Sequence, residues 1–572
     1  MRNARLPCMF AAFALAAGLL LSAVPANAAG KVSLCVTDVD VGPSGLNLRD
    51  ALIGGGLVTF ACKPGTTITV TTTHKVTGEA AVDGGGTVAL KTNSVRAMFL
   101  VEGVLQLRGL TLGNPFTGLP TTPVPAGIGV GPGVITLDDS QVRDSANPFQ
   151  VDTIRVGTSR FEHNHGFSII GARVAILFRS SFTDNSAVVL RSGKTPEPGR
   201  PSLAVIGEST FSRNESAVWW AGELHVSKSS FSDHDNKGRA GGALHLQGAT
   251  AIDHSSFDRN HAASGGAIWM DAGTLSLRRA VFHDNVAQAD GGAIGLGETG
   301  ENTVVSQYGT FEGNSAVRGG AIKMGTPGAE TALQGGPNTF ARNKASFGGA
   351  VYSAFSGIQL VRAVFTDNAA ATEGGAVYSS RLGSPRAAIF ANSLLVRNAA
   401  PDGSAVSGSA VTLINSTVTS NQGIAVSLKP LSHFSDPSAR GVLDLRNGLV
   451  SNNAGGNCTE LPPGFSLRHN GHSLQFPDLT CGAAVHSADP LLGPFYVPQS
   501  GSPAFDGGDN ALCANTPISG RDIYSARRPQ GKFCAIGAVE GELDPRTVLS
   551  LTERVRDWTR HSRASVLWLL NR

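Results

Sequence analysis

The feature that most constrains the fold is an internal repeat in which a phenylalanine is followed three positions later by an asparagine. Weaker copies are Leu395/Asn398, Val418/Asn421 and Leu449/Asn452, and the copy at Phe231 carries His234 in place of the asparagine. A period of about 20 to 30 residues is typical of solenoids, whose stacked units share one core. The clear copies are Phe161/Asn164, Phe182/Asn185, Phe211/Asn214, Phe257/Asn260, Phe282/Asn285, Phe311/Asn314, Phe340/Asn343 and Phe365/Asn368.

A second signature, two glycines followed by Ala and an aliphatic residue, comes after the asparagine. It occurs at Gly241–Leu244, Gly265–Ile268, Gly291–Ile294, Gly319–Ile322, Gly348–Val351 and Gly374–Val377. Between the signatures lie short alternating apolar segments with no helical period. A leucine-rich repeat has a similar length, but it needs a Leu-dominated pattern that is missing here.

These patterns predict a parallel β-helix in which like residues stack on like from coil to coil. We expect the phenylalanines to stack inside, and the glycine pairs to make a corner where a side chain would clash or φ must be positive. The high content of 71 Gly and the low charged fraction of 16% agree with one such architecture. The buried asparagines should form a hydrogen-bonded ladder of Asn164, Asn185, Asn214, Asn260, Asn285, Asn314, Asn343 and Asn368.

Residues near the two ends of the chain predict secretion and disulfide bonds. Residues 1–28 have a basic start, an apolar run and a small-residue site, so we expect a secretory signal peptide cleaved after Ala28. The apolar run is too short for a membrane span, and no later segment is suitable for one. Of the seven cysteines, Cys8 lies in the leader, and an even number in an oxidising compartment favours disulfides. All of them flank the repeats, so of the fifteen possible connectivities we expect sequence neighbours to pair: Cys35 with Cys62, Cys458 with Cys481, and Cys513 with Cys534.

A stacked solenoid exposes a strand edge at each end, so caps are expected. We place an N-terminal cap at 29–75, with a short amphipathic helix at Leu46–Ile53, the β-helix repeats at 76–455, and a disulfide-stapled C-terminal cap at 456–540. The tail at 541–572 has apolar residues at helical spacing beside several arginines. It predicts a basic amphipathic helix that docks as a plain cap or on a membrane.

The chain resembles a known group of secreted proteins. The GGA(I/V/L) and FxxN repeats are similar to those of the chlamydial polymorphic outer-membrane proteins, and Gly45–Leu52, Asp83–Gly86 and Leu105–Leu112 resemble a CSLREA-type start. The resemblance implies an all-β fold, a single right-handed parallel β-helix of the pectin-lyase-like solenoid type, with N- and C-terminal caps. It also implies an adhesin-like protein of the cell surface. A choice-of-anchor Q-like C-terminus is carried by Ser451–Cys458, Asp489–Gly493, Gly501–Ala504, Arg528–Gly531 and Cys534–Glu540.

Residues at one offset from the phenylalanine form a line on the surface, and two lines bear on function. Two positions after the phenylalanine the charges alternate in sign, as in a ladder of exposed ion pairs. Calcium would need clustered carboxylates instead. The line reads Asp184, Arg213, Asp233, Arg259, Asp284, Gly313, Arg342, Asp367 and Arg397.

The second line follows the inward residue that closes the GGAI strand, and strand alternation points it outward. Its exposed rings suit a sugar or protein surface, unless a loop covers them or they are scattered surface aromatics. We take Trp219, His245, Trp269, Lys323, Tyr352 and Tyr378 as the candidate ligand-facing column. The full line is Val189, Trp219, His245, Trp269, Gly295, Lys323, Tyr352, Tyr378, Ser407 and Ser427.

These patterns favour a non-enzymatic surface-binding protein whose partner is a glycan or another surface protein. The net charge of +3 disfavours a nucleic-acid partner. We expect no catalytic residues, cofactor or metal, because the histidines between His225 and His283 occupy different offsets and no nucleophile elbow occurs. Two alternatives stay open. One is a polysaccharide-active enzyme of the lyase type, which would need converging carboxylates with a Lys or Arg base, and the other is a structural component of the envelope.

Overall fold

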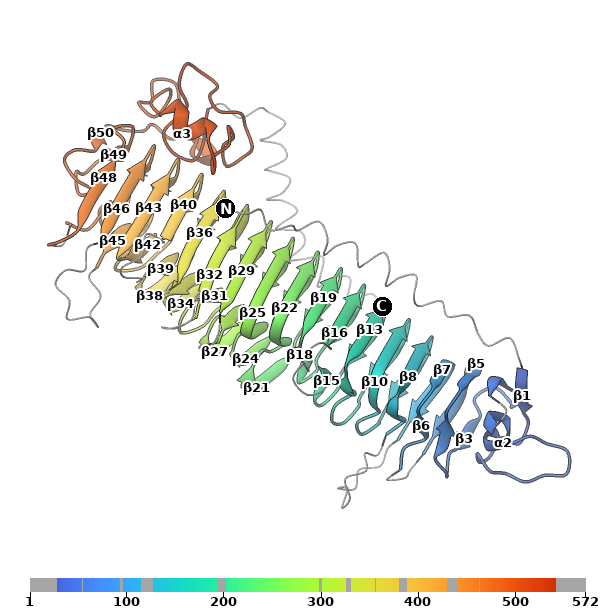
Figure 1. Ribbon diagram of the computed structural model, residues 1–572. Coiled ribbons are helices and arrows are strands. Elements are labelled where there is room, and N and C mark those ends of the chain that lie inside the picture. Colours follow the sequence, from blue (N-terminus) through green and yellow to red (C-terminus); the bar gives the residue numbers. More distant parts are fainter. Residues whose placement is uncertain are drawn as a thin grey trace. The chain divides into compact units, whose positions relative to one another are not determined.

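The computed structural model describes residues 28–53, 55–92, 96–114, 127–192, 202–297, 301–325, 331–354, 356–379, 388–429, 441–461 and 463–541. The predicted leader before Ala28 and the basic tail beyond Gly541 lie outside these residues. The chain divides into two compact units, Met1–Leu333 with Asn343–Ala345 and Gln334–Arg342 with Ser346–Arg572. Each unit is a stack of parallel β-strands, so the predicted all-β parallel solenoid is confirmed (Figure 1).

The first unit begins with the predicted N-terminal helix, α2 (Leu48–Ile53), which buries Leu48 and Ala51. Parallel pairing already starts here, because β1 (Ala28–Val32) pairs with β2 (Gly56–Phe60) and β2 with β5 (Glu79–Lys91). The expected N-terminal cap is therefore partly a coil of the solenoid. The other early strands are β3 (Thr67–Thr69), β4 (His74–Val76), β6 (Phe99–Val101), β7 (Val104–Gly113) and β8 (Gly129–Asp138).

Each later coil of the first unit has a strand before the phenylalanine, a short strand that contains it, and a strand after the asparagine. The phenylalanine strands are β11 (Arg160–Glu162), β14 (Ser181–Thr183), β17 (Thr210–Ser212), β20 (Ser230–Ser232), β23 (Ser256–Asp258), β26 (Val281–His283) and β30 (Thr310–Glu312). The strand aligned with them before Phe161 is β9 (Gln141–Arg143), which carries Val142 in place of the phenylalanine. The strands around them are β10 (Phe149–Gly157), β12 (Ile169–Ala172), β13 (Val174–Phe178), β15 (Val188–Ser192), β16 (Leu203–Gly207), β18 (Ser216–Ala221), β19 (Glu223–Ser227), β22 (Leu244–Asp253), β25 (Ile268–Arg278), β28 (Ile294–Leu296), β29 (Asn302–Gln307) and β31 (Ile322–Lys323). A separate parallel sheet comprises β21 (Asp235–Ala240), β24 (His261–Ser264) and β27 (Val286–Asp290).

The second unit repeats this arrangement. Its strands are β33 (Asn338–Ala341), β35 (Val351–Ser353), β36 (Gly357–Val361), β37 (Ala363–Thr366), β38 (Ala369–Glu373), β39 (Val377–Ser379), β40 (Ala388–Ala391), β41 (Leu394–Val396), β42 (Val406–Gly408), β43 (Ala410–Ile414), β44 (Thr417–Thr419), β45 (Val426–Leu428), β46 (Val442–Arg446), β47 (Leu449–Ser451), β48 (Ser466–His469), β49 (Leu474–Phe476) and β50 (His486–Ser487). Two strands contain residues of both units, β32 (Thr331–Gly335) and β34 (Lys344–Phe347).

The phenylalanines stack inside the solenoid as the repeat predicts. In the first unit the rings of Phe211, Phe231, Phe257 and Phe282 are fully buried, and neighbouring centroids lie 4.8–4.9 Å apart with nearly parallel planes. In-register parallel pairing, such as Phe231 with Phe257, fixes this spacing. Offset-stacked rings contribute about 0.5 to 1.5 kcal/mol per pair beyond their burial.

The asparagines lie buried beside this stack and form a ladder. Asn285 Nδ2 donates to the carbonyl oxygen of Phe257 at 3.0 Å and to Asn314 Oδ1 at 2.9 Å, and Asn285 Oδ1 accepts from Asn260 Nδ2 at 2.9 Å. In the second unit Asn368 donates in the same way to Phe340 and Asn398. At these corners the ladder thus supplies partners for the buried amide groups, as buried polar groups require.

The three disulfides join the expected neighbours, Cys35 with Cys62, Cys458 with Cys481, and Cys513 with Cys534. The expected C-terminal cap, however, consists of two different parts. Parallel pairing continues past residue 456, because β48 pairs with β46 and β49 pairs with β47. The remainder, residues 489–541, contains η2 (Pro494–Tyr496) and α3 (Asn510–Ala514). It lies along the side of the coils, beside β40, β43 and β46 (Figure 1). We call it the C-terminal flank.

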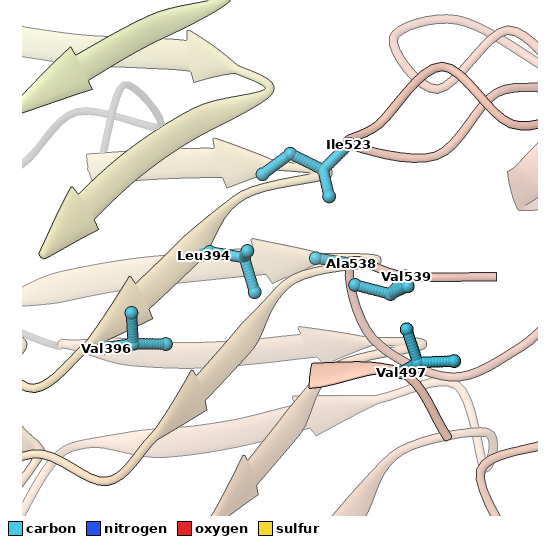
Figure 2. Close-up of a cluster of buried hydrophobic side chains, with 6 residues drawn as sticks. All are labelled: Leu394, Val396, Val497, Ile523, Ala538 and Val539. Atoms are coloured by element: carbon cyan, nitrogen blue, oxygen red, sulfur yellow. The ribbon is translucent and has the colours of Figure 1, made fainter. Parts of the chain in front are cut away.

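Apolar side chains on the outside of the coils explain where the flank docks. Leu394 and Val396 point outward from β41 and form a buried cluster with Val497, Ile523, Ala538 and Val539 of the flank (Figure 2). The outward positions of the corresponding strands in the first unit are mostly polar, for example Thr210 and Ser212 of β17. The change from polar to apolar outward residues therefore marks the surface that the flank covers.

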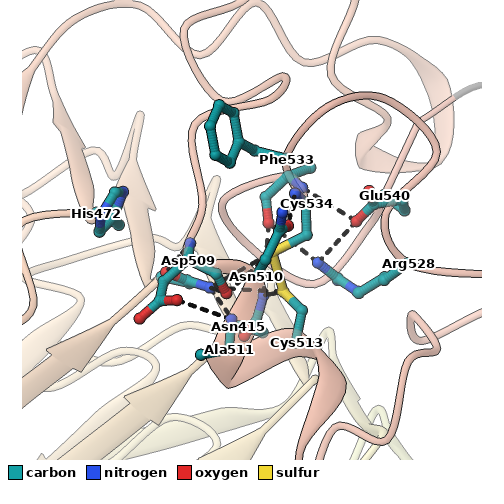
Figure 3. The surroundings of a disulfide bond; sticks show 12 residues. Asn415, His472, Asp509, Asn510, Ala511, Cys513, Arg528, Phe533, Cys534 and Glu540 are labelled. Atoms are coloured by element: carbon teal, nitrogen blue, oxygen red, sulfur yellow. Dashed lines mark hydrogen bonds and ion pairs between the residues drawn. A yellow bond between two sulfur atoms is a disulfide. The ribbon is translucent and has the colours of Figure 1, made fainter.

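The disulfide Cys513–Cys534 lies where the flank meets the coils (Figure 3). Asn415 Nδ2 lies 3.2 Å from Cys513 Sγ. Nearby, the fully buried guanidinium of Arg528 lies 3.1 Å from Glu540. Burial lowers the pKa of Arg528 and raises the pKa of Glu540, and their mutual attraction opposes both changes.

Candidate functional site

The outward column of the first unit runs along the strands that follow the asparagine corner. Parallel register aligns Trp219 with His245, His245 with Trp269, and Trp269 with Gly295. At the other side of Trp219 the aligned residue is Arg191, not Val189, which is fully buried. In β15 the residue that aligns with Trp219 is therefore two positions later than the one expected from counting residues after the phenylalanine motif.

The side chains of this column touch one another in sequence. The Arg191 guanidinium carbon lies 4.9 Å from the ring centroid of Phe167 and 4.6 Å from that of Trp219. On its other face the Trp219 ring stacks on His245, with centroids 5.0 Å apart. We call Phe167, Arg191, Trp219, His245, Trp269 and Asp271 the aromatic–basic column; each of these side chains is partly exposed.

Asp271 fixes the end of the aromatic–basic column. His245 Nε2 lies 2.8 Å from its Oδ2, and Trp269 Nε1 donates to its Oδ1 at 2.8 Å. The hydrogen bond from His245 holds the pKa of Asp271 below its ordinary value, although burial opposes this. The Trp269 ring lies over Gly295, where an added Cβ would come within 2.7 Å of ring carbon Cε3. The two rings are thus held in fixed orientations.

This packing changes the mode of contact that the sequence suggests. In-register stacking turns the faces of aromatic rings toward the neighbouring coils, so Trp219 has Arg191 on one face and His245 on the other. Only the ring edges remain for solvent. Sugar rings that stack face to face on aromatic residues need an open face. The expected stacking of a sugar on Trp219 is therefore wrong, because its two faces are occupied.

Lys323 belongs to the predicted column but does not face a ligand. Its side chain is only 1% exposed, and its Nζ donates to the carbonyl oxygen of Leu296 at 3.3 Å and lies 3.9 Å from Asp290. Asp290 also receives two hydrogen bonds from Arg318. Lys323 turns inward because Asp290, the residue before the glycine pair of the previous coil, offers it an anionic partner.

In the second unit the column begins with two tyrosines. The rings of Tyr352 and Tyr378 are stacked with centroids 4.9 Å apart and an angle of 4° between their planes, and both are partly exposed. Phe347 approaches Tyr378 edge-on at 6.2 Å. The next aligned residues, Ser407 and Ser427, are buried.

A polar cluster lies directly beyond these tyrosines. Lys429 Nζ lies 2.7 Å from Glu373 and 2.6 Å from Asp402, and the Ser407 hydroxyl donates to Glu373 at 3.1 Å. Burial opposes the charge on Lys429, but the hydrogen bonds that it donates to both carboxylates hold its pKa above the ordinary value. We call Glu373, Asp402 and Lys429 the lysine–carboxylate cluster. It brings together a lysine and two carboxylates, the combination that the sequence did not reveal.

The alternating charges at the asparagine corner form ion pairs between successive coils. Arg213 binds Asp184 with two hydrogen bonds of 2.7 and 2.8 Å, and Arg259 binds Asp233 in the same way at 2.8 and 3.1 Å. Each arginine takes the aspartate of the preceding coil, so Arg213 does not bridge two aspartates. The hydrogen bond from Arg213 lowers the pKa of Asp184. The pairing disperses negative charge along this line.

Within the described ranges, no three His, Cys, Asp or Glu side chains are grouped so that they could hold a metal ion. In the same part of the chain, no helix has the length and apolar character needed to span a bilayer.

The sequence did not point to Arg191 or to the lysine–carboxylate cluster as parts of a candidate site, because both depend on register or on distant residues. Arg191 lies at an offset that the glycine signature does not mark. Lys429 comes after the last clear repeat, and Glu373 and Asp402 precede the glycine corners of two different coils. One signal was available: a charged residue directly before the corner glycine at Asp290, Glu373 and Asp402.

Residues 362–380, which include Phe365 and Asn368 of the repeat, match the sequence model of the Chlamydia polymorphic membrane protein repeat. Among solved structures, the A-module of mannuronan C-5 epimerase AlgE6 from Azotobacter vinelandii is 11% identical, with 74% of this chain and 92% of that chain covered and a TM-score of 0.18. No curated protein matches the chain. The chain is a β-solenoid with a repeat of the polymorphic membrane protein type, and its three disulfides are typical of an extracellular or surface protein.

Proposed function

We propose that this is a secreted or surface-displayed, non-enzymatic binding protein whose outward columns hold a glycan or another surface molecule. A leader cleaved after Ala28 would deliver it, and the cut would fall within β1. The observation that carries the proposal is the aromatic–basic column, a continuous line of partly exposed side chains that hold one another in place.

The fixed orientation of the side chains in the aromatic–basic column favours a role in ligand binding. A ligand that meets Trp219 or Trp269 does not have to order these rings, because His245, Asp271 and Gly295 already fix them. Avoiding that ordering increases affinity by about 0.5 to 1.5 kcal/mol per immobilised side chain. Tyr352 and Tyr378 form a second fixed pair of ring edges in the other unit.

The proposal can be tested by measuring how well variants of the column residues are retained on immobilised ligands. The parent protein is applied to immobilised neutral and acidic polysaccharides and to fixed cell surfaces. The variants are Trp219→Ala with Trp269→Ala in one unit, and Tyr352→Ala with Tyr378→Ala in the other. Loss of two pre-organised ring contacts, at about 0.5 to 1.5 kcal/mol each, predicts at least a fivefold loss of retention.

The matched control is Tyr308→Ala, which removes a ring that is 55% exposed elsewhere in the first unit. It should leave retention unchanged. Equal retention by both double variants, with circular dichroism like that of the parent, would show that these columns are not the binding surface.

The lysine–carboxylate cluster favours a second candidate, a polysaccharide-active enzyme. A lyase needs a base and a cation that neutralises the substrate carboxylate, and Lys429 with Glu373 and Asp402 offers both kinds of group beside Tyr378. The raised pKa of Lys429 makes it a poor base, so binding remains the leading proposal. Incubation with uronate polysaccharides, followed by ultraviolet absorbance of unsaturated products, separates the two. Product formed by the parent and lost in Lys429→Met would establish the enzyme.

A further inference from the structure

Arg191 stands apart from other arginines on the first unit. Arg173, Arg213 and Arg278 each bind an aspartate of the preceding coil at 3.2, 2.7 and 2.6 Å. Among the residues that the structure describes, no carboxylate lies within ion-pair distance of Arg191. Its guanidinium instead lies over two aromatic rings, Phe167 of the preceding coil and Trp219 of the following one.

This arrangement fixes the orientation of the cation, and no carboxylate of the described residues neutralises it. A guanidinium is planar and carries its N–H donors in that plane, so contacts above and below with rings leave the donors available at its edge. The rings also lower the number of conformations that the long side chain must lose when it binds a partner. A fixed, uncompensated guanidinium suits a planar oxyanion such as a carboxylate, or a sulfate.

The occupied ring faces also favour a charged ligand over a neutral one. Trp219 has Arg191 on one face and His245 on the other, so it offers a neutral sugar no open face to stack on. Charge and hydrogen bonding at the outer edge of the column are then the strongest means of recognition that it has. Asp271 does not oppose an anion strongly, because His245 and Trp269 both bind it.

We propose that Arg191 is the anion-recognition residue of the aromatic–basic column and that the ligand is an acidic glycan, read through a carboxylate or sulfate group. This inference rests on the proposed glycan-binding function and specifies its substrate class.

Binding of three defined chains tests the inference. Polygalacturonate carries carboxylates, dextran sulfate carries sulfates, and dextran is neutral. Affinities of the parent, Arg191→Gln, Arg191→Lys and Arg173→Gln are measured by biolayer interferometry at low and high salt, after circular dichroism has confirmed the fold. Arg173→Gln is the matched control, because it removes an equal charge from the same unit at a paired site.

We expect Arg191→Gln to lose about tenfold or more in affinity for one of the acidic chains, and Arg191→Lys to lose part of it, because lysine lacks the planar fork. Arg173→Gln should bind like the parent, and higher salt should weaken only the Arg191-dependent binding. The chain that shows the effect distinguishes carboxylate from sulfate.

Two results overturn the inference in different ways. If the parent binds the acidic chains and Arg191→Gln binds them equally well, Arg191 does not recognise the anion, while the proposed function stands. If the parent binds dextran as well as the charged chains, the ligand is not selected by charge. Retention of none of the chains by the parent overturns both this inference and the glycan-binding function on which it rests.

Discussion

Replacement of His234 by asparagine should stabilise the first unit and reduce its sensitivity to acid. His234 occupies the ladder position that asparagine holds in the neighbouring coils, and it is buried. Its Nδ1 lies 3.2 Å from the backbone nitrogen of Asn214 and equally far from the carbonyl oxygen of Asn214, whereas Nε2 has no partner among the described residues. The ladder is therefore incomplete at this one coil.

The magnitude at neutral pH follows from the bonds that asparagine would add. Asn260 Nδ2 donates to Phe231 and to Asn285, and an asparagine at 234 could donate similarly to Phe211 and Asn260. Two hydrogen bonds at about 1 kcal/mol each, less about 1 kcal/mol for the smaller side chain, predict a gain of about 1 kcal/mol.

The magnitude at acid pH follows from the pKa of His234, which burial lowers from 6.5 to about 4. Because the folded-state pKa is the lower one, the unfolded chain takes up the proton first. The stability that neutral His234 permits is complete above about pH 6.5 and is lost as the pH falls to about 4. At about 1.4 kcal/mol per pH unit, the loss is about 3 kcal/mol. The advantage of His234→Asn should therefore widen to about 4 kcal/mol at pH 4.

Urea unfolding followed by circular dichroism at several pH values between 4 and 8 measures both effects. Comparing the two proteins at each pH cancels every other group that titrates in this range. The reciprocal variant Asn285→His is the control, since it should lose stability and gain acid sensitivity. Parallel stability curves for the parent and His234→Asn would refute the reasoning, because they would mean that position 234 is not a buried histidine in the ladder.

Three further predictions concern the flank and the surface. Arg528→Met should cost about 3 to 5 kcal/mol by leaving Glu540 buried and unpaired, and should expose the C-terminal flank to proteolysis, whereas replacing both residues by apolar ones should cost less. Replacing Cys513 and Cys534 by serine should destabilise the flank by about 3 kcal/mol, measured as faster proteolysis of residues 489–541 while the far-ultraviolet circular dichroism of the strands persists. Arg213→Gln should change the free energy of unfolding by less than about 1 kcal/mol, and salt should diminish the difference, since its ion pair is exposed.

Features that recur at the same position in successive coils could be predicted from the sequence. Phe257 and Asn285 could be placed inside because parallel stacking forces equal offsets to share one environment. The three disulfides could be expected because the cysteines lie at the two ends of the repeat region. The pairing of Arg213 with Asp184 follows from the same argument, although the sequence could not say which of two neighbouring aspartates the arginine binds.

Features that arise where one coil differs from its neighbours could not be predicted from the sequence. Lys323 shares the offset of Trp269, yet it turns inward because one coil places Asp290 within its reach. Arg191 enters the aromatic–basic column only through a local shift of register. The C-terminal flank could have been suspected from outward apolar residues such as Leu394 and Val396, but their partners lie about a hundred or more residues away, beyond any repeat pattern.

The measurement that tests the central claim most directly is hydroxyl-radical footprinting of the protein with and without the polysaccharide that retains it. Binding along these columns should lower the oxidation of Trp219 and Trp269, or of Tyr352 and Tyr378, when the ligand is bound, while Tyr308 reacts at an unchanged rate. Unchanged oxidation of all four column residues under conditions where most of the protein is bound would contradict the claim that these columns are the binding surface.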